Sequence, residues 1–121
     1  MNKAVRWIEH QGKKILLNDY TGLKGEQYLA AIEATRQEKL KLPVGTYHRA
    51  LTIISGTAVS AETTAKGQEV ADLNRDRKLV GPSAIVGASE LVASVTKMIQ
   101  PSVYIAKTVE EAKDWLASQP E

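Results

Sequence analysis

Short apolar runs alternate with longer amphipathic segments along the chain, and the two patterns predict different elements. Near the N-terminus, apolar runs at residues 4–9 and 13–19 are separated by Gln11 and Gly12, a pair typical of a tight turn. Alternation over such short runs predicts two strands. The connection is too short for a parallel crossover, so the two strands should form an antiparallel hairpin.

Three further strands are predicted at residues 48–55, 83–87 and 102–106. The first of them contains Leu51 and Ile53 in an almost continuous apolar run, which is typical of a strand buried on both faces. Each run is short and is bounded by glycine, proline or serine. These strands should therefore lie inside a sheet.

Four helices are predicted between and after these strands. They cover residues 24–42, residues 61–76, a segment from Ser89 to the residue before Pro101, and a segment that follows Thr108. Ser60, Ser89 and Thr108 can each accept a hydrogen bond from a free amide of the next turn. Thr108 and Glu111 also have the spacing of a capping box.

The last two helices carry the apolar stripes that we expect to be buried. In the third helix, the spacing of the apolar residues is the clearest amphipathic pattern in the chain. It consists of Leu91, Val92, Val95, Met98 and Ile99, and we expect Met98 to lie in the core. In the final helix, Trp115 and Leu116 should pack inward together with Val109 and Ala112.

The predicted order is therefore ββαβαβαβα within one domain, residues 1–121. Strands that alternate with helices imply a mostly parallel sheet with right-handed crossovers. The expected fold is α/β, with a mostly parallel five-stranded sheet and four helices.

Composition narrows the classes of function. Hydrophobic residues are 43% and charged residues 25% of the chain, as in ordinary globular domains. The net charge of +2 comes from residues of both signs that are scattered along the chain, which argues against nucleic-acid binding. No apolar stretch is long enough for membrane insertion, and the N-terminus does not resemble a signal peptide. Because there are no cysteines, disulfides and thiolate catalysis are excluded, and a cytoplasmic location is expected.

Candidate binding residues follow the predicted strands, because ligands of open parallel sheets bind beyond the carboxyl ends of the strands. The loops after the strands at residues 48–55 and 83–87 lead into helix N-termini. Free amides and small hydroxyl residues at such a terminus can hold an anion. The simpler interpretation is that glycine makes each turn and serine or threonine caps the helix. The candidates are Asp19, Ser55, Gly56, Thr57, Gly87 and Ser89.

A catalytic centre is harder to assemble from these residues. His10 and His48 are the only histidines, and the predicted elements do not bring them together. Ser55 and Ser89 therefore have no evident base to activate them. Asp19 is the one carboxylate at a strand end, where it can also cap a turn. We expect no catalytic residues, no metal site and no cofactor.

Four segments together resemble the SpoIIAA-like group of the STAS family, which are relatives of bacterial anti-sigma-factor antagonists. They are residues 12–23, 54–56, 83–87 and 108–116. The resemblance implies a non-catalytic bacterial protein that binds a protein partner. It also places Ser55 where relatives carry a phosphorylated serine. Ile53 and Ile54 stand where those relatives have an acid and a first serine, so we expect Ser55 mainly to end the strand.

The leading hypothesis is a non-enzymatic, cytoplasmic STAS-like regulatory module that acts through protein–protein contact, with a homodimer left open. The competing hypothesis is a small-ligand binder for an anion or a lipid, as in Sec14-type domains of the same fold, at the carboxyl ends of the strands. The third hypothesis is that the protein is an enzyme. An apolar surface patch favours a protein partner, an apolar cavity favours a ligand, and converging polar groups around a buried Asp19 favour an enzyme.

Overall fold

The computed structural model describes residues 2–121, and its elements follow the predicted order along the chain. The strands are β1 (Val5–His10), β2 (Lys13–Asp19), β3 (Arg49–Ile53), β4 (Ser83–Val86) and β5 (Tyr104–Ala106). The helices are α1 (Gly25–Leu40), α2 (Ala61–Asp76), α3 (Glu90–Ile99) and α4 (Val109–Ser118). None of the helices in the described part of the chain is long and apolar enough to cross a membrane.

The five strands form one sheet in which they lie in chain order, β1-β2-β3-β4-β5. β1 is antiparallel to β2, and every later neighbour pair is parallel. The predicted hairpin is confirmed: Gln11 and Gly12 have φ values of 52° and 76° and connect β1 to β2. Two consecutive positive φ values are the geometry of the turn whose twist matches a β-hairpin.

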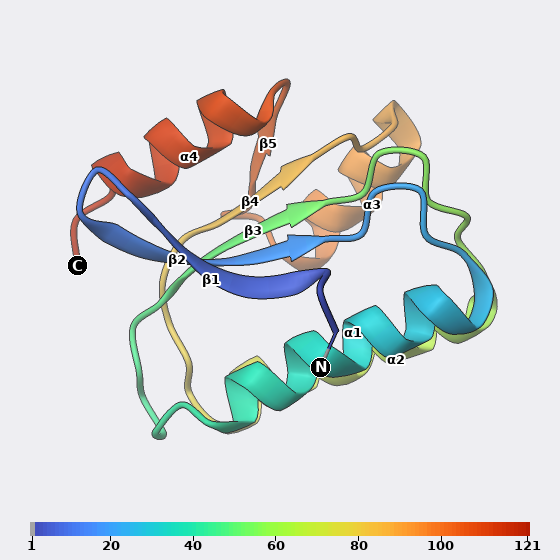
Figure 1. The fold of residues 1–121 in the computed structure, drawn as a ribbon, viewed down its shortest axis with the longest axis horizontal. Coiled ribbons are helices and arrows are strands. Elements are labelled where there is room, and N and C mark those ends of the chain that lie inside the picture. Colours follow the sequence, from blue (N-terminus) through green and yellow to red (C-terminus); the bar gives the residue numbers. More distant parts are fainter. Residues whose placement is uncertain (1) are drawn as a thin grey trace.

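The helices divide unequally between the two faces of the sheet (Figure 1). α4 lies alone on one face, and α1, α2 and α3 lie on the other. Right-handed crossovers that all move in one direction across a sheet place their helices on the same face, which explains the grouping of α1 to α3. α2 packs mainly against α1, where Lys66 Nζ lies 2.6 Å from a carboxylate oxygen of Glu33.

The face under α4 is a continuous apolar core. Alternate residues of the strands and one stripe of α4 meet there, and none is more than 8% exposed. The buried members are Ile15, Leu17, Leu51, Ile53, Ala84, Val86, Ala106, Ala112 and Leu116. The prediction that Leu116 packs inward is confirmed.

The opposite face is less uniform. Its apolar residues gather where α1 covers β1 and β2, with Leu16, Tyr20, Tyr28 and Ile32 buried together. This face also carries polar side chains: Asn18 of β2 is 2% exposed, and Thr52 of β3 is half-buried. α1 therefore closes only part of this face.

The predicted helix caps are confirmed. Ser60 accepts a hydrogen bond from the Thr63 amide, and the Thr63 side chain accepts one in return from the Ser60 amide. Ser89 and Thr108 accept hydrogen bonds from the amides of Val92 and Glu111, at the starts of α3 and α4. The predicted capping box of Thr108 and Glu111 is only half formed, because the Glu111 carboxylate accepts from the amide of Lys107, one residue before the cap.

Trp115 is only half-buried, which corrects the expectation that it packs fully inward. Its ring stacks on the ring of Tyr104, with centroids 4.6 Å apart. β5 is a short strand at one edge of the sheet, so within the described residues no further strand continues the sheet beyond it.

α3 contradicts the expectation for its apolar stripe. Leu91 is 75% exposed and Met98 81% exposed, and no residue of this helix is buried. The half-buried face of α3 is formed by Val92, Ala93 and Thr96 instead. Periodicity shows that one face of a helix is apolar, but it does not show that another part of the same chain covers that face.

The core assignment predicts the cost of truncating α4. Replacing the fully buried Leu116 with Ala should lower the free energy of unfolding by about 2–5 kcal/mol, because transfer and cavity costs add. The control Leu91→Ala should change it by less than about 0.5 kcal/mol, since that side chain is exposed. Urea unfolding measures both, and equal midpoint shifts would contradict this assignment.

Candidate functional site

The loops that follow β2, β3 and β4 lie side by side. The amide of Gly22 donates to the carbonyl of Ser55 at 2.9 Å, and Gly56 lies against the backbone of Gly22. Gly87 has φ +89°, and a Cβ there would come within 2.6 Å of the Ser55 amide nitrogen. This position therefore needs glycine for the close approach of the two loops.

The polar groups of these loops are occupied locally. Asp19, which is half-buried, accepts hydrogen bonds from the amide and hydroxyl of Thr21. Thr57 donates to the carbonyl of Ile54, and Ser89 caps α3. The structure thus brings several of the sequence-predicted candidates together, but in the roles of turn and cap residues. Asp19 is not the buried centre of converging polar groups that an enzyme would require.

A cleft that the sequence did not predict lies on the α1–α3 face of the sheet. It has a volume of about 360 Å³ and crosses β2, β3 and β4 between α2 and α3. Val70 of α2 lines one side, and Val95 and Ile99 of α3 line the other. Thr52 and Ile85 lie among the lining residues from the sheet. The lining comes from many elements, so no local motif could have revealed this cleft.

A chain of hydrogen bonds runs along one side of the cleft. The hydroxyls of Tyr20 and Thr35 bond to each other, Thr35 donates to Asn18 Oδ1 at 2.8 Å, and Asn18 donates to Thr52 at 3.3 Å. Burial raises the pKa of the Tyr20 hydroxyl well above its ordinary value, and the hydrogen bond with Thr35 opposes that shift in part. Tyr20 is therefore a neutral hydrogen-bonding group at physiological pH.

Lys39 is the most unusual group in the cleft lining. Its side chain is 5% exposed, and its Nζ lies 2.9 Å from His48 Nε2 and 3.1 Å from Asn74 Oδ1. None of the ion pairs within residues 2–121 includes this lysine. Burial lowers the pKa of Lys39 to about 8, so the group is still mostly charged at pH 7.

His48 is kept neutral by the same surroundings. Burial and then the charge of Lys39 lower the pKa of its imidazole to about 4. The Nε2 of a neutral imidazole can accept a hydrogen bond from the lysine ammonium group. The sequence places Lys39 on a helix and His48 at the start of a strand, without any signal that the two side chains meet.

A larger hollow of about 800 Å³ lies beside this pair, between the hairpin and the end of α1. Its lining mixes charges of both signs, among them Glu9, Lys13, Lys41 and Arg49. Such a surface gives no preference for one charge or for an apolar group. The cleft between α2 and α3 is the more selective of the two cavities.

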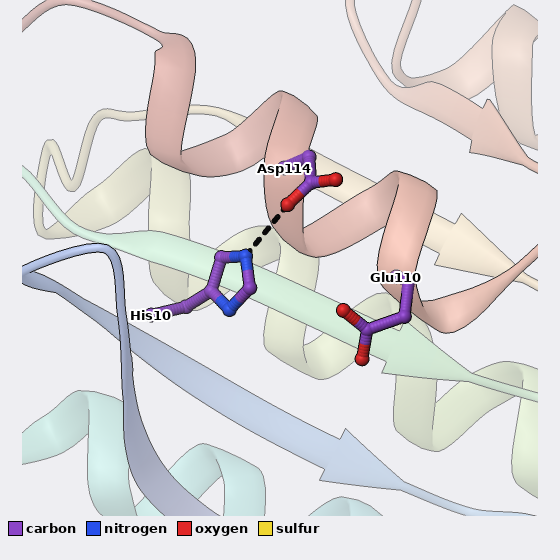
Figure 2. A group of neighbouring side chains, drawn as sticks. All are labelled: His10, Glu110 and Asp114. Atoms are coloured by element: carbon purple, nitrogen blue, oxygen red, sulfur yellow. Dashed lines mark hydrogen bonds and ion pairs between the residues drawn. The ribbon is translucent and has the colours of Figure 1, made fainter.

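One group of side chains has the composition of a metal site (Figure 2). His10 Nε2 lies 2.7 Å from Asp114 Oδ1, and Glu110 is one turn away on α4. One ligand atom from each residue lies within 4.8 Å of the others, and imidazole with carboxylates suits Zn²⁺. Both carboxylates are exposed, and Gln11 also donates to Asp114. These contacts already account for the group as a hydrogen-bonded link between the hairpin and α4.

Comparison with known proteins adds no relative, since no family model and no curated protein matches the sequence.

The depressed pKa of His48 predicts a loss of stability in acid. Its pKa is about 4 in the folded state and about 6.5 when unfolded, so the unfolded chain takes up the proton first. Stability should fall as the pH drops from about 6.5 through 4, by up to about 3 kcal/mol from this group.

The variant His48→Gln isolates that contribution, because it keeps an acceptor near Lys39 but does not titrate. Urea unfolding between pH 7 and pH 4 should show a shallower pH dependence for the variant than for the parent protein. Carboxylates with lowered pKa values, such as Glu33 and Glu111, titrate in both proteins and cancel in the comparison. Parallel curves would show that His48 is not kept neutral by burial.

Proposed function

We propose that this protein is a non-catalytic binding module that acts through protein–protein contact, with α3 as the contact element. The observation that carries the proposal is the exposed apolar stripe of this helix, where Leu91, Val95, Met98 and Ile99 are between 48% and 81% exposed. A contiguous patch of exposed apolar side chains is uncommon on a protein surface and usually marks an interaction site. An amphipathic helix that lays its apolar face into a groove is a common mode of recognition.

The position of α3 supports this role. The helix is capped at Ser89 and lies between β4 and β5 in the chain. These two strands contribute residues to the core, whereas no residue of α3 is buried. None of the closely packed pairs of elements in residues 2–121 includes α3. A partner can therefore cover the stripe without disturbing the core under α4.

The proposal includes a regulatory role in a bacterial cytoplasm, as in the STAS proteins that the sequence resembles. The resemblance in four segments and the ββαβαβαβα order support it. The strands lie in chain order across the sheet, which differs from the order in the STAS fold, so membership in that family is itself part of the proposal.

A small-ligand binder is the second candidate, and the cleft beneath α3 favours it. This cleft crosses the face of the sheet, whereas the sequence suggested a site at the carboxyl ends of the strands. An enzyme has less support. In the described residues, neither histidine is bonded to a serine: His10 pairs with Asp114, and His48 with Lys39.

Charge on the apolar stripe should abolish partner binding. The double variant Leu91→Glu, Met98→Glu places two acids on the exposed stripe, where they would be desolvated in an apolar interface. Both residues are exposed, so the fold should be retained, as circular dichroism and the urea midpoint can verify. Affinity capture from the native host, followed by mass spectrometry, identifies the proteins that bind the parent and not the variant.

Lys97→Glu is the matched control, because it also adds an acid to the last turns of α3 but lies away from the stripe. A partner should bind this control and the parent equally. If the double variant captures the same proteins as the parent, α3 is not the contact element. Sedimentation of the purified protein shows whether the partner is a second copy of the chain.

Ser55 should serve as a strand-end residue and carry little phosphate. It is half-buried, its hydroxyl packs against Gly87, and its carbonyl accepts from Gly22. Added phosphate would bring about 1.5–2 negative charges into this tight junction. Intact-mass analysis of protein from the native host measures the modification, with Ser55→Ala as the control for its position. A substantial phosphorylated fraction that disappears in this variant would establish Ser55 as a switch.

A further inference from the structure

Lys39 is the only charged residue among those that line the cleft between α2 and α3 in the described chain. Lysine is almost never buried without an anionic partner, because the charged form loses its hydration. Here both hydrogen-bond partners of the ammonium group, His48 and Asn74, are uncharged acceptors. An ammonium group has three donors, so one of them is left for a further acceptor.

The rest of the cleft is suited to an apolar group. Val70, Val95 and Ile99 supply its sides from two helices, and Ile85 contributes from β4. Val95 is 48% exposed and Ile99 63% exposed, so both have surface that a bound molecule could cover. The volume of about 360 Å³ falls at the small end of the range for ligand pockets.

The geometry therefore has one buried cation beside a cleft whose surface is mainly apolar and which polar side chains also line. We propose that this cleft binds a small amphipathic carboxylic acid, with its carboxylate on Lys39 and its apolar chain along Val95 and Ile99 of α3. Asn74, which lies 3.1 Å from Lys39 Nζ, has an amide group that can donate a further hydrogen bond to the carboxylate.

A carboxylate fits this site better than a phosphate. Phosphate sites in proteins gather several cations, an arginine fork or free amides at a helix N-terminus. Lys39 stands in the last turn of α1, where the helix dipole is negative and only one cation is present. The single negative charge of a carboxylate matches the single positive charge of Lys39.

Decanoate is the probe that tests this inference by isothermal titration calorimetry. It should bind the parent protein at one site, and Lys39→Met should weaken it by about tenfold or more, since a buried charge pair is lost. Methionine has a similar length and no charge, so this variant should fold, as the urea midpoint can verify. Lys41→Met, which removes an exposed lysine two residues away, should bind decanoate within about twofold of the parent.

Two further probes separate the charge from the chain. Decanol should bind more weakly than decanoate and with the same affinity in the parent and in Lys39→Met, whereas acetate should not bind measurably. The inference is overturned if Lys39→Met binds decanoate as tightly as the parent, if decanol matches decanoate, or if decanoate shows no saturable binding.

The stripe and the cleft share Val95 and Ile99, so the stripe residues that lie outside the cleft lining separate the two proposals. The variant Leu91→Glu, Met98→Glu changes residues outside the cleft lining, so it should still bind decanoate. Loss of the protein partner with retained decanoate binding would separate the two functions. Loss of decanoate binding in that variant would contradict the placement of the ligand on the inner side of α3.

Discussion

Adjacent residues of the central strands point to opposite faces of the sheet, and the two sets differ in chemistry. Ile15 and Leu17 of β2 join the core under α4, whereas Leu16 and Asn18 face α1. β3 repeats the division with Thr52, which bonds to Asn18. The first face can be sealed by one apolar helix. The second carries buried amide and hydroxyl groups that require hydrogen-bond partners, so it cannot be closed by aliphatic packing alone. This asymmetry separates the closed apolar core under α4 from an opposite face with buried polar groups and a cleft.

The positions of the helices explain why part of the second face is uncovered. α1 covers β1 and β2, and α2 packs mainly against α1, which leaves β3 and β4 partly uncovered on that face. α3 then lies at the far side of a cleft with no buried residue of its own. A loosely packed element costs little to move or to cover, and binding elements are drawn from such regions. The exposed stripe and the cleft therefore have the same cause, which is the incomplete packing of α3 against the sheet.

Two buried basic groups show how context sets their roles. Arg49 is 5% exposed, and its guanidinium donates to the carbonyls of Leu116 and Gln119 at the end of α4. Those carbonyls carry the negative end of the helix dipole, so the charge of Arg49 is compensated within the fold. Lys39 has similar burial but only the neutral acceptors of His48 and Asn74. The first cation completes the structure, and the second remains available to an anion.

The sequence by itself determined the element order, the hairpin and the helix caps, because these depend on neighbours within a few residues. Ser60 and Thr63, for example, form the α2 cap from local spacing alone. It also identified the apolar stripe of α3, but not that Met98 lies at the surface, since burial depends on what another element covers. The meeting of Lys39 with His48 and Asn74 joins three elements with no shared motif. Only the tertiary structure decided these contacts, because they arise from the packing of α1, α2 and α3 over the sheet.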